Sequence, residues 1–419
     1  MFNSLYTLTD ALIVSWGVGV DAMGGVAAVL PFAMLQGAIA TMLGGGAAAI
    51  IARQLGAGEK KNAAQTAFNA MAVFYISALI VTALGLIFIE LLLNLLGPEP
   101  ALRPYSKTYL TIILASNVFS TGFSAIMRAE GKLRYATLQW VVPISLNIVA
   151  DAVFVLALKL GVAGAAYATV VTQVFSFCMA MYFFARKSDL KFKGVRFNCK
   201  VIADVVTTGL PSLIQQGAAA LGMAILNNLL AATGGAAAQN IYAYISKIYF
   251  FCLMPFSALT QALLPVASHN IGAKKRDRVK SAFNCSMLFA LGFAVLFTAV
   301  CAILPRQLLS LFTDDASVLS DGASALRILS LSLPMMFLPM LTGVLFQADS
   351  KKLGAAVLFA SGLLPVLPLA LLGGRLWGTV GIWAAFPVAG VLATVFAAAM
   401  LLWFWRKDMI TNGVPRTSV

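Results

Sequence analysis

The sequence predicts an all-α membrane protein with about twelve transmembrane helices in two pseudo-symmetric lobes of six. Three observations support this fold class: the composition, a series of long apolar segments and an internal repeat. Of the 419 residues, 61% are hydrophobic and only 11% are charged, whereas about a quarter of a soluble domain is charged. So much apolar surface requires lipid as its solvent. The alternation typical of a β-barrel is absent, so we expect helical spans.

Twelve apolar segments lie between polar loops, and each has close to the roughly 20 residues that a helix needs to cross a bilayer. The first is short and begins at Met1 without a polar flank, so we expect the start of its helix to be missing. No cleavable signal peptide is visible. The predicted spans are 1–18, 26–49, 68–96, 107–127, 136–158, 162–184, 209–231, 240–264, 283–304, 324–346, 354–372 and 379–404.

The second half of the chain repeats motifs of the first at an offset of about 217 residues. Gly56 and Gly272 open matching stretches, and Gly161 matches Gly378. Six spans in each half give both halves one orientation, so the repeat is parallel, about an axis along the membrane normal. Such a repeat commonly places a substrate cavity between the halves, opened alternately to each side. The predicted parts are an N-lobe at 1–184, a cytoplasmic linker at 185–208, a C-lobe at 209–404 and a cytoplasmic tail at 405–419.

The net charge of +14 sets the topology of the chain rather than marking a nucleic-acid partner. Most of the 29 Lys and Arg residues lie in alternate loops, in the central loop and in the C-terminal tail. The positive-inside rule therefore predicts a multi-pass protein of the bacterial inner membrane with both termini in the cytoplasm.

Most signals for enzymatic or cofactor chemistry are missing from the sequence. The five cysteines include no C-x-x-C pair, and the single histidine, His269, is a poor metal site on its own. No phosphate-binding G-x-x-x-x-G-K-[ST] loop is present, so a gradient-driven carrier is simpler than an ATP-driven one. We expect no cofactor.

Ionisable residues within apolar spans are costly and therefore mark functional sites. Asp10 lies in the first span and Asp151 in the fifth, where Asn147 shares its helical face at i, i+4 spacing. Thr169 lies inside the sixth span. Their oxygens suit Na⁺, and a buried carboxylate suits H⁺. In the repeat, Asp10 corresponds to Asn227 and Asp151 to Pro368, so the fold does not require these carboxylates.

A second set of residues suggests a cavity that accommodates many shapes, because thioethers and aromatic rings repack readily. Simple packing or lipid contact is the alternative interpretation for each of them, and snorkelling is the alternative for the lysine. The candidates in spans eight and ten are Lys247, Tyr249, Met254, Phe256, Met336 and Met340.

Over almost its whole length, the chain resembles the MATE (multidrug and toxic compound extrusion) family of cation-coupled antiporters. The resemblance implies twelve helices in two lobes and a first-half cation site, whose pattern falls on Asp10, Asn147, Asp151 and Thr169. Span seven has Gln215 and Gln216 where some sodium-coupled members have a glutamate. The stretches that carry the resemblance are Ser4–Asp10, Ala52–Gly58, Arg128–Gly131, Leu146–Asp151, Gly161–Ala166, Gly209–Ser212 and Ile271–Lys274.

These observations predict a monomeric antiporter that exports amphipathic, often cationic, drugs or metabolites in exchange for H⁺ or Na⁺. One alternative is a lipid-linked glycan flippase of the same superfamily, which needs several basic residues in its cavity. Lys247 and Arg327 are the only candidates for that role. Another alternative is an intramembrane aspartyl protease, whose two carboxylates must lie close enough to share a proton.

Overall fold

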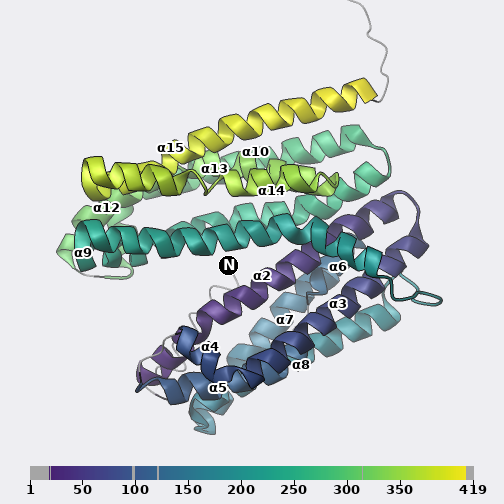
Figure 1. Cartoon of the computed structure of the whole chain (residues 1–419), viewed down its shortest axis with the longest axis horizontal. Helices are drawn as coiled ribbons and strands as arrows, with labels where there is room; N and C mark the ends of the chain where they lie inside the picture. The colour runs from purple at the N-terminus through teal and green to yellow at the C-terminus, as the bar shows by residue number, and fades with distance from the viewer. Residues whose placement is uncertain (1–17, 19, 97–99, 120–121, 314, 412–419) are drawn as a thin grey trace, which may run out of the picture. The chain divides into compact units, whose positions relative to one another are not determined.

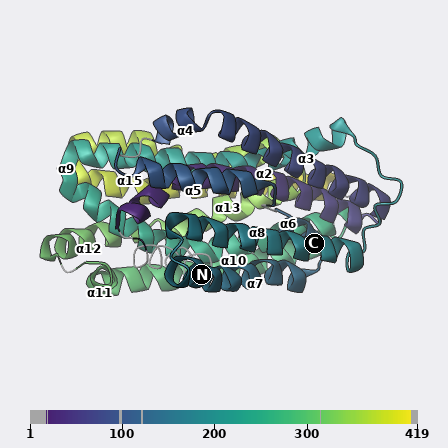
Figure 2. The same ribbon diagram turned by 90° about the horizontal axis from the view of Figure 1, so that it is seen from below.

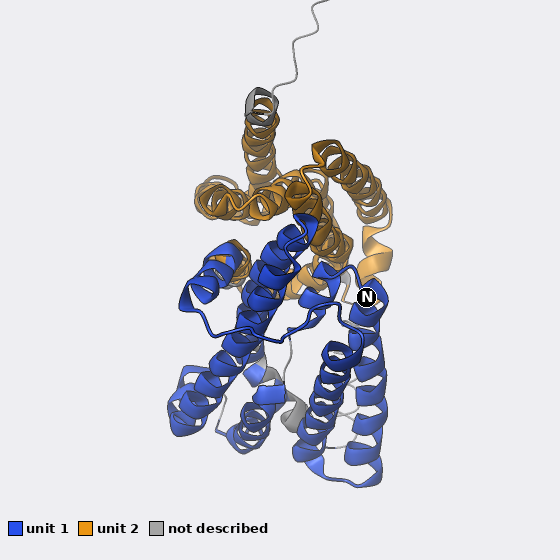
Figure 3. Cartoon of the chain, turned by 90° about the vertical axis from the view of Figure 1, so that its right-hand side faces the viewer, with its two compact units in different colours: residues 1–209 blue, residues 210–419 orange. Residues whose placement is uncertain are grey.

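A computed structural model describes residue 18 and residues 20–96, 100–119, 122–313 and 315–411 of the chain. Across these residues all regular structure is helical (Figure 1). The predicted span 1–18, apart from Val18, lies outside the described residues, and Asp10 lies outside them with it. The chain divides into two compact units, residues 1–209 and 210–419 (Figure 3).

Unit 1 consists of helices that follow one another through short connections and run side by side (Figure 2). A 3₁₀ turn at Asn117–Phe119 and a π-helical turn at Ala152–Ala157 interrupt the regular series. Its helices are α2 (Val20–Gly56), α3 (Lys60–Ile87), α4 (Ile89–Leu96), α5 (Arg103–Ser116), α6 (Ser124–Ala129), α7 (Leu133–Asp151) and α8 (Gly161–Arg186).

Unit 2 begins within α9 (Cys199–Gly272), which breaks at Gly235, where φ is 63°. The last helix, α15 (Val366–Thr411), breaks in the same way at Trp377 and Gly378. The break in α9 separates the predicted spans 209–231 and 240–264. The break in α15 separates the predicted span 379–404 from the end of the span 354–372, which begins in α14. The helices between them are α10 (Arg276–Ile303), α11 (Pro305–Ser310), α12 (Ala316–Ser330), α13 (Leu333–Ala348) and α14 (Lys352–Ser361).

Within the described residues, eight helices are long and apolar enough to cross a membrane. A ninth span follows if the pair Val318–Ser330 and Leu333–Ala348, bent by 41°, is counted as one. The helix of the predicted span 68–96 begins earlier, at Lys60, and ends at Ile87. The rest of that span forms the separate helix α4, whose Glu90 pairs with Arg103 at 2.8 Å.

The internal repeat is visible in the backbone. Three turns of unit 1 have a left-handed φ at Gly58, Gly131 and Gly161, and three turns of unit 2 have one at the matching positions Lys274, Ser350 and Gly378. A hydrogen bond between helices also repeats: Thr82 donates to the Leu114 carbonyl at 2.8 Å, and Thr298 donates to the Ser330 carbonyl at 3.1 Å. The two halves therefore share turn geometry as well as sequence motifs.

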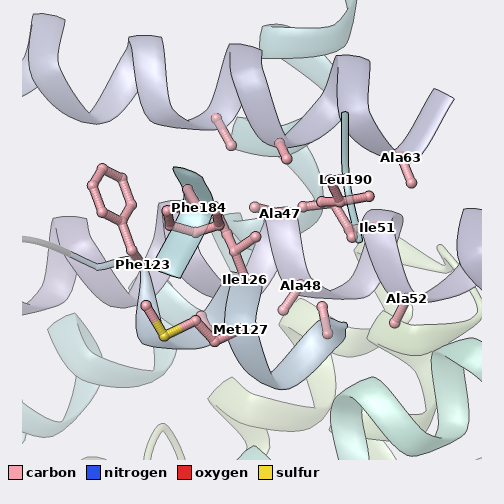
Figure 4. Packing of buried hydrophobic residues seen from close by; sticks show 14 of the residues in the cluster. Ala47, Ala48, Ile51, Ala52, Ala63, Phe123, Ile126, Met127, Phe184 and Leu190 are labelled. Atoms are coloured by element: carbon pink, nitrogen blue, oxygen red, sulfur yellow. The ribbon is translucent and has the colours of Figure 1, made fainter. Parts of the chain in front are cut away.

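The core of unit 1 brings small residues of α2 and α3 against Phe123, which directly precedes α6, and against aromatic residues of α8 (Figure 4). The rings of Phe123 and Phe184 meet edge to face with centroids 5.7 Å apart. Near this core, α2 and the start of α9 approach so closely that a Cβ on Gly46 would collide with the Val205 carbonyl. A Cβ on Gly209 would collide with the backbone carbonyl of Met42. Small residues commonly permit such an approach between membrane helices.

The segment between α8 and α9 packs onto unit 1. Leu190 is buried in the core cluster that Figure 4 shows. Asn69 donates to the Arg196 carbonyl at 3.1 Å and accepts from the Asn198 backbone N–H at 2.7 Å. Ser188 donates to the Glu130 carboxylate at 2.8 Å. Side chains of unit 1 thus hold the backbone of this segment.

Candidate cation site

Asn147 and Asp151 lie one helical turn apart on the buried face of α7, with 1% and 0% of their surface exposed. Asp151 is the last residue of α7, and the π-helical turn Ala152–Ala157 follows it directly. A π-turn re-aims the neighbouring side chains and is frequent at functional sites. The local helix geometry therefore places a carboxylate and an amide together at a break in the regular helix.

The Asn147 amide is the clearest sign of a binding site. Its Oδ1 and Nδ2 are both buried, and neither has a hydrogen-bond partner among the described residues. Buried side-chain amides are normally satisfied by protein, water or a ligand. An oxygen in this position suits the coordination of a hard cation such as Na⁺. The donor set thus fits the ion that the sequence predicts at this place.

Thr169 is a half-buried residue of α8, and its hydroxyl donates to the Ala165 carbonyl at 3.2 Å. A hydroxyl oxygen that donates its hydrogen retains lone pairs for a cation. The helices α7 and α8 pack together, and Gln139 of α7 bonds Ser176 of α8 at 2.7 Å. From this register we expect Asn147 to lie at the level of Thr169. Asn147, Asp151 and Thr169 thus belong to two helices that pack against each other, and Asp10 lies outside the described residues.

Two of the predicted cavity residues, Tyr249 and Met336, contact each other within unit 2. The Tyr249 hydroxyl shares a hydrogen bond of 2.9 Å with Ser332 and lies 3.0 Å from the Met336 sulfur. The rings of Phe386 and Tyr249 meet edge to face, with their centroids 6.4 Å apart. Tyr249 is buried, so its hydroxyl serves the packing of α9 against α13.

Phe256 and Met340 line a shallow crevice together with Phe337, on which Phe256 stacks; even with open solvent included, its empty space is only about 140 Å³. Pockets for drug-sized ligands have volumes of about 300–1,000 Å³. This crevice is therefore too small to hold such a ligand in the described conformation. Met254 lies half-buried on the same helix.

Lys247 is exposed, and its ammonium lies 5.7 Å from the ring centroids of both Tyr244 and Phe312. It is two residues from Tyr249, so the two side chains leave opposite faces of α9. The structure thus separates Lys247 from the Tyr249–Met336 contact. The six predicted cavity residues do not form one group within unit 2.

Sequence reasoning missed three polar residues on the α7–α8 interface: Gln139, Gln173 and Ser176. The spacing from Gln139 to Asn147 and Asp151, in multiples of four, is a signal that was available. Within the described ranges, no group of three or more His, Cys, Asp or Glu side chains gathers to hold a metal. Amide and hydroxyl oxygens therefore dominate this interface.

A duplicated helical membrane fold with a buried carboxylate in one half is typical of a polytopic membrane transporter. The chain belongs to the MatE family, whose profile matches residues 1–153 and 211–372. It is 24% identical to the multidrug export protein MepA of Staphylococcus saprophyticus, over 98% of this chain and 92% of that protein. It is 25% identical to an FAD transporter of Shewanella oneidensis, over 92% of this chain and 88% of that one.

Solved structures share the fold of the chain. An outward-facing multidrug resistance MATE transporter of the MOP superfamily superposes with a TM-score of 0.91 at 24% identity, covering 98% of this chain and 93% of that one. A MOP superfamily transporter from Pyrococcus furiosus gives a TM-score of 0.90 with the same identity and coverage. The members of this family are transporters, so the protease alternative is wrong.

Proposed function

We propose that the chain is a cation-coupled antiporter that exports amphipathic, often cationic, small molecules through alternating access of its two lobes. The observation that carries the proposal is the buried Asn147–Asp151 pair, whose second-half equivalents are Leu364 and Pro368. Because the second half builds the same fold without these polar groups, packing alone does not explain them.

The proposed mechanism uses the free energy of a cation at this pair. H⁺ or Na⁺ neutralises Asp151, with Asn147 and Thr169 as neutral ligands and Asp10 as the second carboxylate. Neutralisation removes a desolvation cost and allows the surrounding helices to repack. The cation must bind the drug-releasing state more tightly than the other state, because equal affinity for both shifts nothing.

Transport in everted vesicles tests the coupling, with Na⁺ and H⁺ gradients imposed separately. Asp10→Asn and Asp151→Asn are each expected to abolish gradient-driven efflux while leaving membrane insertion intact, since a neutral amide costs less in lipid. Glu90→Gln is the matched control, because Glu90 is exposed and pairs with Arg103 and Lys107. Full efflux by a well-inserted Asp151→Asn variant would show that this carboxylate is structural.

The substrate class is proposed from the MepA-like relatives and from the shortage of interior positive charge. A dinucleotide such as FAD carries phosphates and needs basic partners. Lys247 and Arg327 are the two candidates for that role within the spans, and Arg327 donates to the Ala302 carbonyl at 3.0 Å. Competition between a cationic dye and FAD for transport separates the two classes. Displacement of dye transport by micromolar FAD would overturn the proposed substrate.

We also propose that six residues of spans eight and ten contact the substrate: Lys247, Tyr249, Met254, Phe256, Met336 and Met340. Alanine substitution at these positions is expected to change the relative rates for different drugs, rather than all rates equally. An unchanged drug profile across the set would exclude a role in recognition.

The proposed topology places both termini and the segment before α9 in the cytoplasm of a bacterial inner membrane, with a monomer as the functional unit. Cys199 is native and exposed at the start of α9. With the other cysteines replaced, a membrane-impermeant maleimide is expected to label Cys199 in everted vesicles and not in intact cells. Labelling in intact cells would reverse the orientation.

A further inference from the structure

The buried face of α7 has polar side chains at three of four successive levels, and Pro143 occupies the fourth. Its positions recur every fourth residue at Gln139, Pro143, Asn147 and Asp151, and all four are buried. Side chains with this spacing lie above one another on one helix face. Asp151 is thus the end of a polar row that continues toward the start of α7.

The facing helix α8 has a matching row. Its buried face runs from Val162 and Ala166 to Ala180 and Phe183. Between these apolar positions, at helical spacing, the same face presents Thr169, Gln173 and Ser176. The polar section of α8 therefore occupies the middle of a face that is otherwise apolar.

A direct hydrogen bond fixes the register of the two rows. The Gln139 amide nitrogen donates to the Ser176 carbonyl at 2.6 Å and to the Ser176 hydroxyl at 2.7 Å. In an antiparallel pair this register places Pro143 opposite Gln173 and Asn147 opposite Thr169. Successive levels are about 6 Å apart, so the row extends about 18 Å from Asp151 to Gln139.

Two levels of this row contain buried polar atoms with no partner among the described residues: Gln173 Oε1 and both amide atoms of Asn147. Pro143 has no N–H, so the Gln139 carbonyl lacks its usual donor in the helix. Water can satisfy both the Asn147 Nδ2 donor and the oxygen acceptors, whereas a cation can bind only the oxygens.

The second half of the protein shows that this row is not needed for the fold. At the repeat offset, the positions of Gln139, Asn147, Gln173 and Ser176 hold Ala356, Leu364, Gly390 and Ala393. A shift of the α7 alignment by two residues, as at Gly131 and Ser350, still gives apolar residues, Leu358 and Val366.

We propose that Gln139, Gln173 and Ser176 continue the cation site as a hydrated path inside unit 1, along which H⁺ or Na⁺ passes between Asp151 and the cytoplasm. The row points toward the start of α7, next to the basic residues Arg128, Lys132 and Arg134. In the described conformation the buried Ala136 and Phe183 separate its last level from that end, so the path is continuous only in a conformation that opens toward the cytoplasm. Neutral amides and hydroxyls suit a path, because a cation must bind them weakly enough to leave. This inference rests on the proposed antiport.

The transport test uses Gln173→Leu, with Ser145→Leu as control, because Ser145 is exposed on α7 and bonds only its own helix at Val141. In proteoliposomes, Gln173→Leu is expected to slow gradient-driven efflux at least tenfold while drug binding changes less than twofold. Retained binding shows that the variant is folded. Ser145→Leu is expected to transport at the wild-type rate. Wild-type transport by Gln173→Leu would overturn the path.

An accessibility test is independent of coupling. In a chain whose native cysteines are replaced, Gln173→Cys is expected to react with a small cationic methanethiosulfonate from the cytoplasmic side, and Ser145→Cys is not. Adding Gln139→Leu is expected to slow the labelling of Gln173→Cys at least fivefold. An unreactive Gln173→Cys overturns the path. If Asp151→Asn leaves efflux intact while Gln173→Cys still labels, the antiport proposal fails and the water path stands.

Discussion

Gln65 and Arg196 are joined by two hydrogen bonds: the Gln65 amide donates to the Arg196 carbonyl, and the Arg196 backbone N–H donates to Gln65 Oε1 at 3.0 Å. The Gln65 side-chain amide thus bonds both the C=O and the N–H of Arg196, as a residue of a neighbouring β-strand does. With Asn69 one turn further on, it holds the backbone before α9 against unit 1.

Removing this pairing is expected to release the segment without unfolding the protein. In Gln65→Ala combined with Asn69→Ala, trypsin is expected to cleave at Lys191, Lys193 or Arg196 at least five times faster, because the backbone no longer has its partners. Asn62→Ala is the control, since Asn62 bonds only its neighbour Glu59. Equal cleavage rates in limited proteolysis of all three proteins would show that the hydrogen bonds do not hold the segment.

Glu130 is expected to give the stability of the protein a pH dependence of defined sign. Burial raises the pKa of Glu130, and the hydrogen bond from Ser188 opposes this only in part. Ionisation therefore costs more in the folded state than in the unfolded state. The free energy of unfolding is expected to fall as pH rises from the ordinary carboxyl pKa of about 4.3 through the raised pKa, and to be level above it.

Thermal melting in detergent across this range measures the effect. Glu130→Gln is expected to flatten the decline. Glu90 gives the opposite case, because its ion pairs with Lys107 and Arg103 lower its pKa. Its small contribution to the free energy of unfolding is therefore lost as pH falls. A Glu130→Gln variant with the wild-type pH profile would assign the dependence to other groups.

The duplicated turns offer a matched test of backbone strain. Lys274 has φ of 56° where the equivalent Gly58 has φ of 80°. A left-handed φ costs a residue with a Cβ about 1 kcal/mol more than glycine. Lys274→Gly is therefore expected to stabilise unit 2 by up to about 1 kcal/mol, and Gly58→Lys to destabilise unit 1 by a similar amount. If the melting temperatures of both variants in detergent shift in the same direction, the prediction is wrong.

The close approach of α2 to the start of α9 is expected to tolerate no side chain. Gly46→Ala and Gly209→Ala each bring a Cβ onto a backbone carbonyl that cannot rotate away, and overpacking of this kind costs about 1–3 kcal/mol. Gly37→Ala on the same helix α2 is the control, because its Cβ meets nothing within 4 Å. Thermal stability and yield are the measurements, and equal melting of Gly46→Ala and Gly37→Ala would exclude the clash.

The sequence predicted the helical spans, the repeat and the shared face of Asn147 and Asp151, because each depends on local periodicity or on charge. The break at Gly235 falls between the predicted spans 209–231 and 240–264. The break at Phe88 was not predicted, because apolar residues continue on both sides of it. Gln173 was missed because its meaning depends on the register with α7, which only packing fixes.

The candidate substrate residues show the same limit. Span eight is rich in aromatic residues and methionine, and this composition does not tell which face each side chain occupies. The structure places Lys247 and Tyr249 on different faces of α9 and joins Tyr249 to Met336. Assigning a face needs the neighbouring helix, α13, which Tyr249 contacts through Met336.

The restriction of the polar row to one half also bears on stoichiometry. Under the proposed antiport, the steepest gradient of exported compound depends on how many cations enter per cycle, because the free energies of the cations add. A second copy of the row, at the positions of Leu364, Phe386 and Gly390, would double that number and square the attainable concentration ratio. Each cycle would then also dissipate twice as much of the cell's ion gradient. A chain with one row reaches a lower concentration ratio of exported compound, and it uses fewer cations for every molecule that it exports.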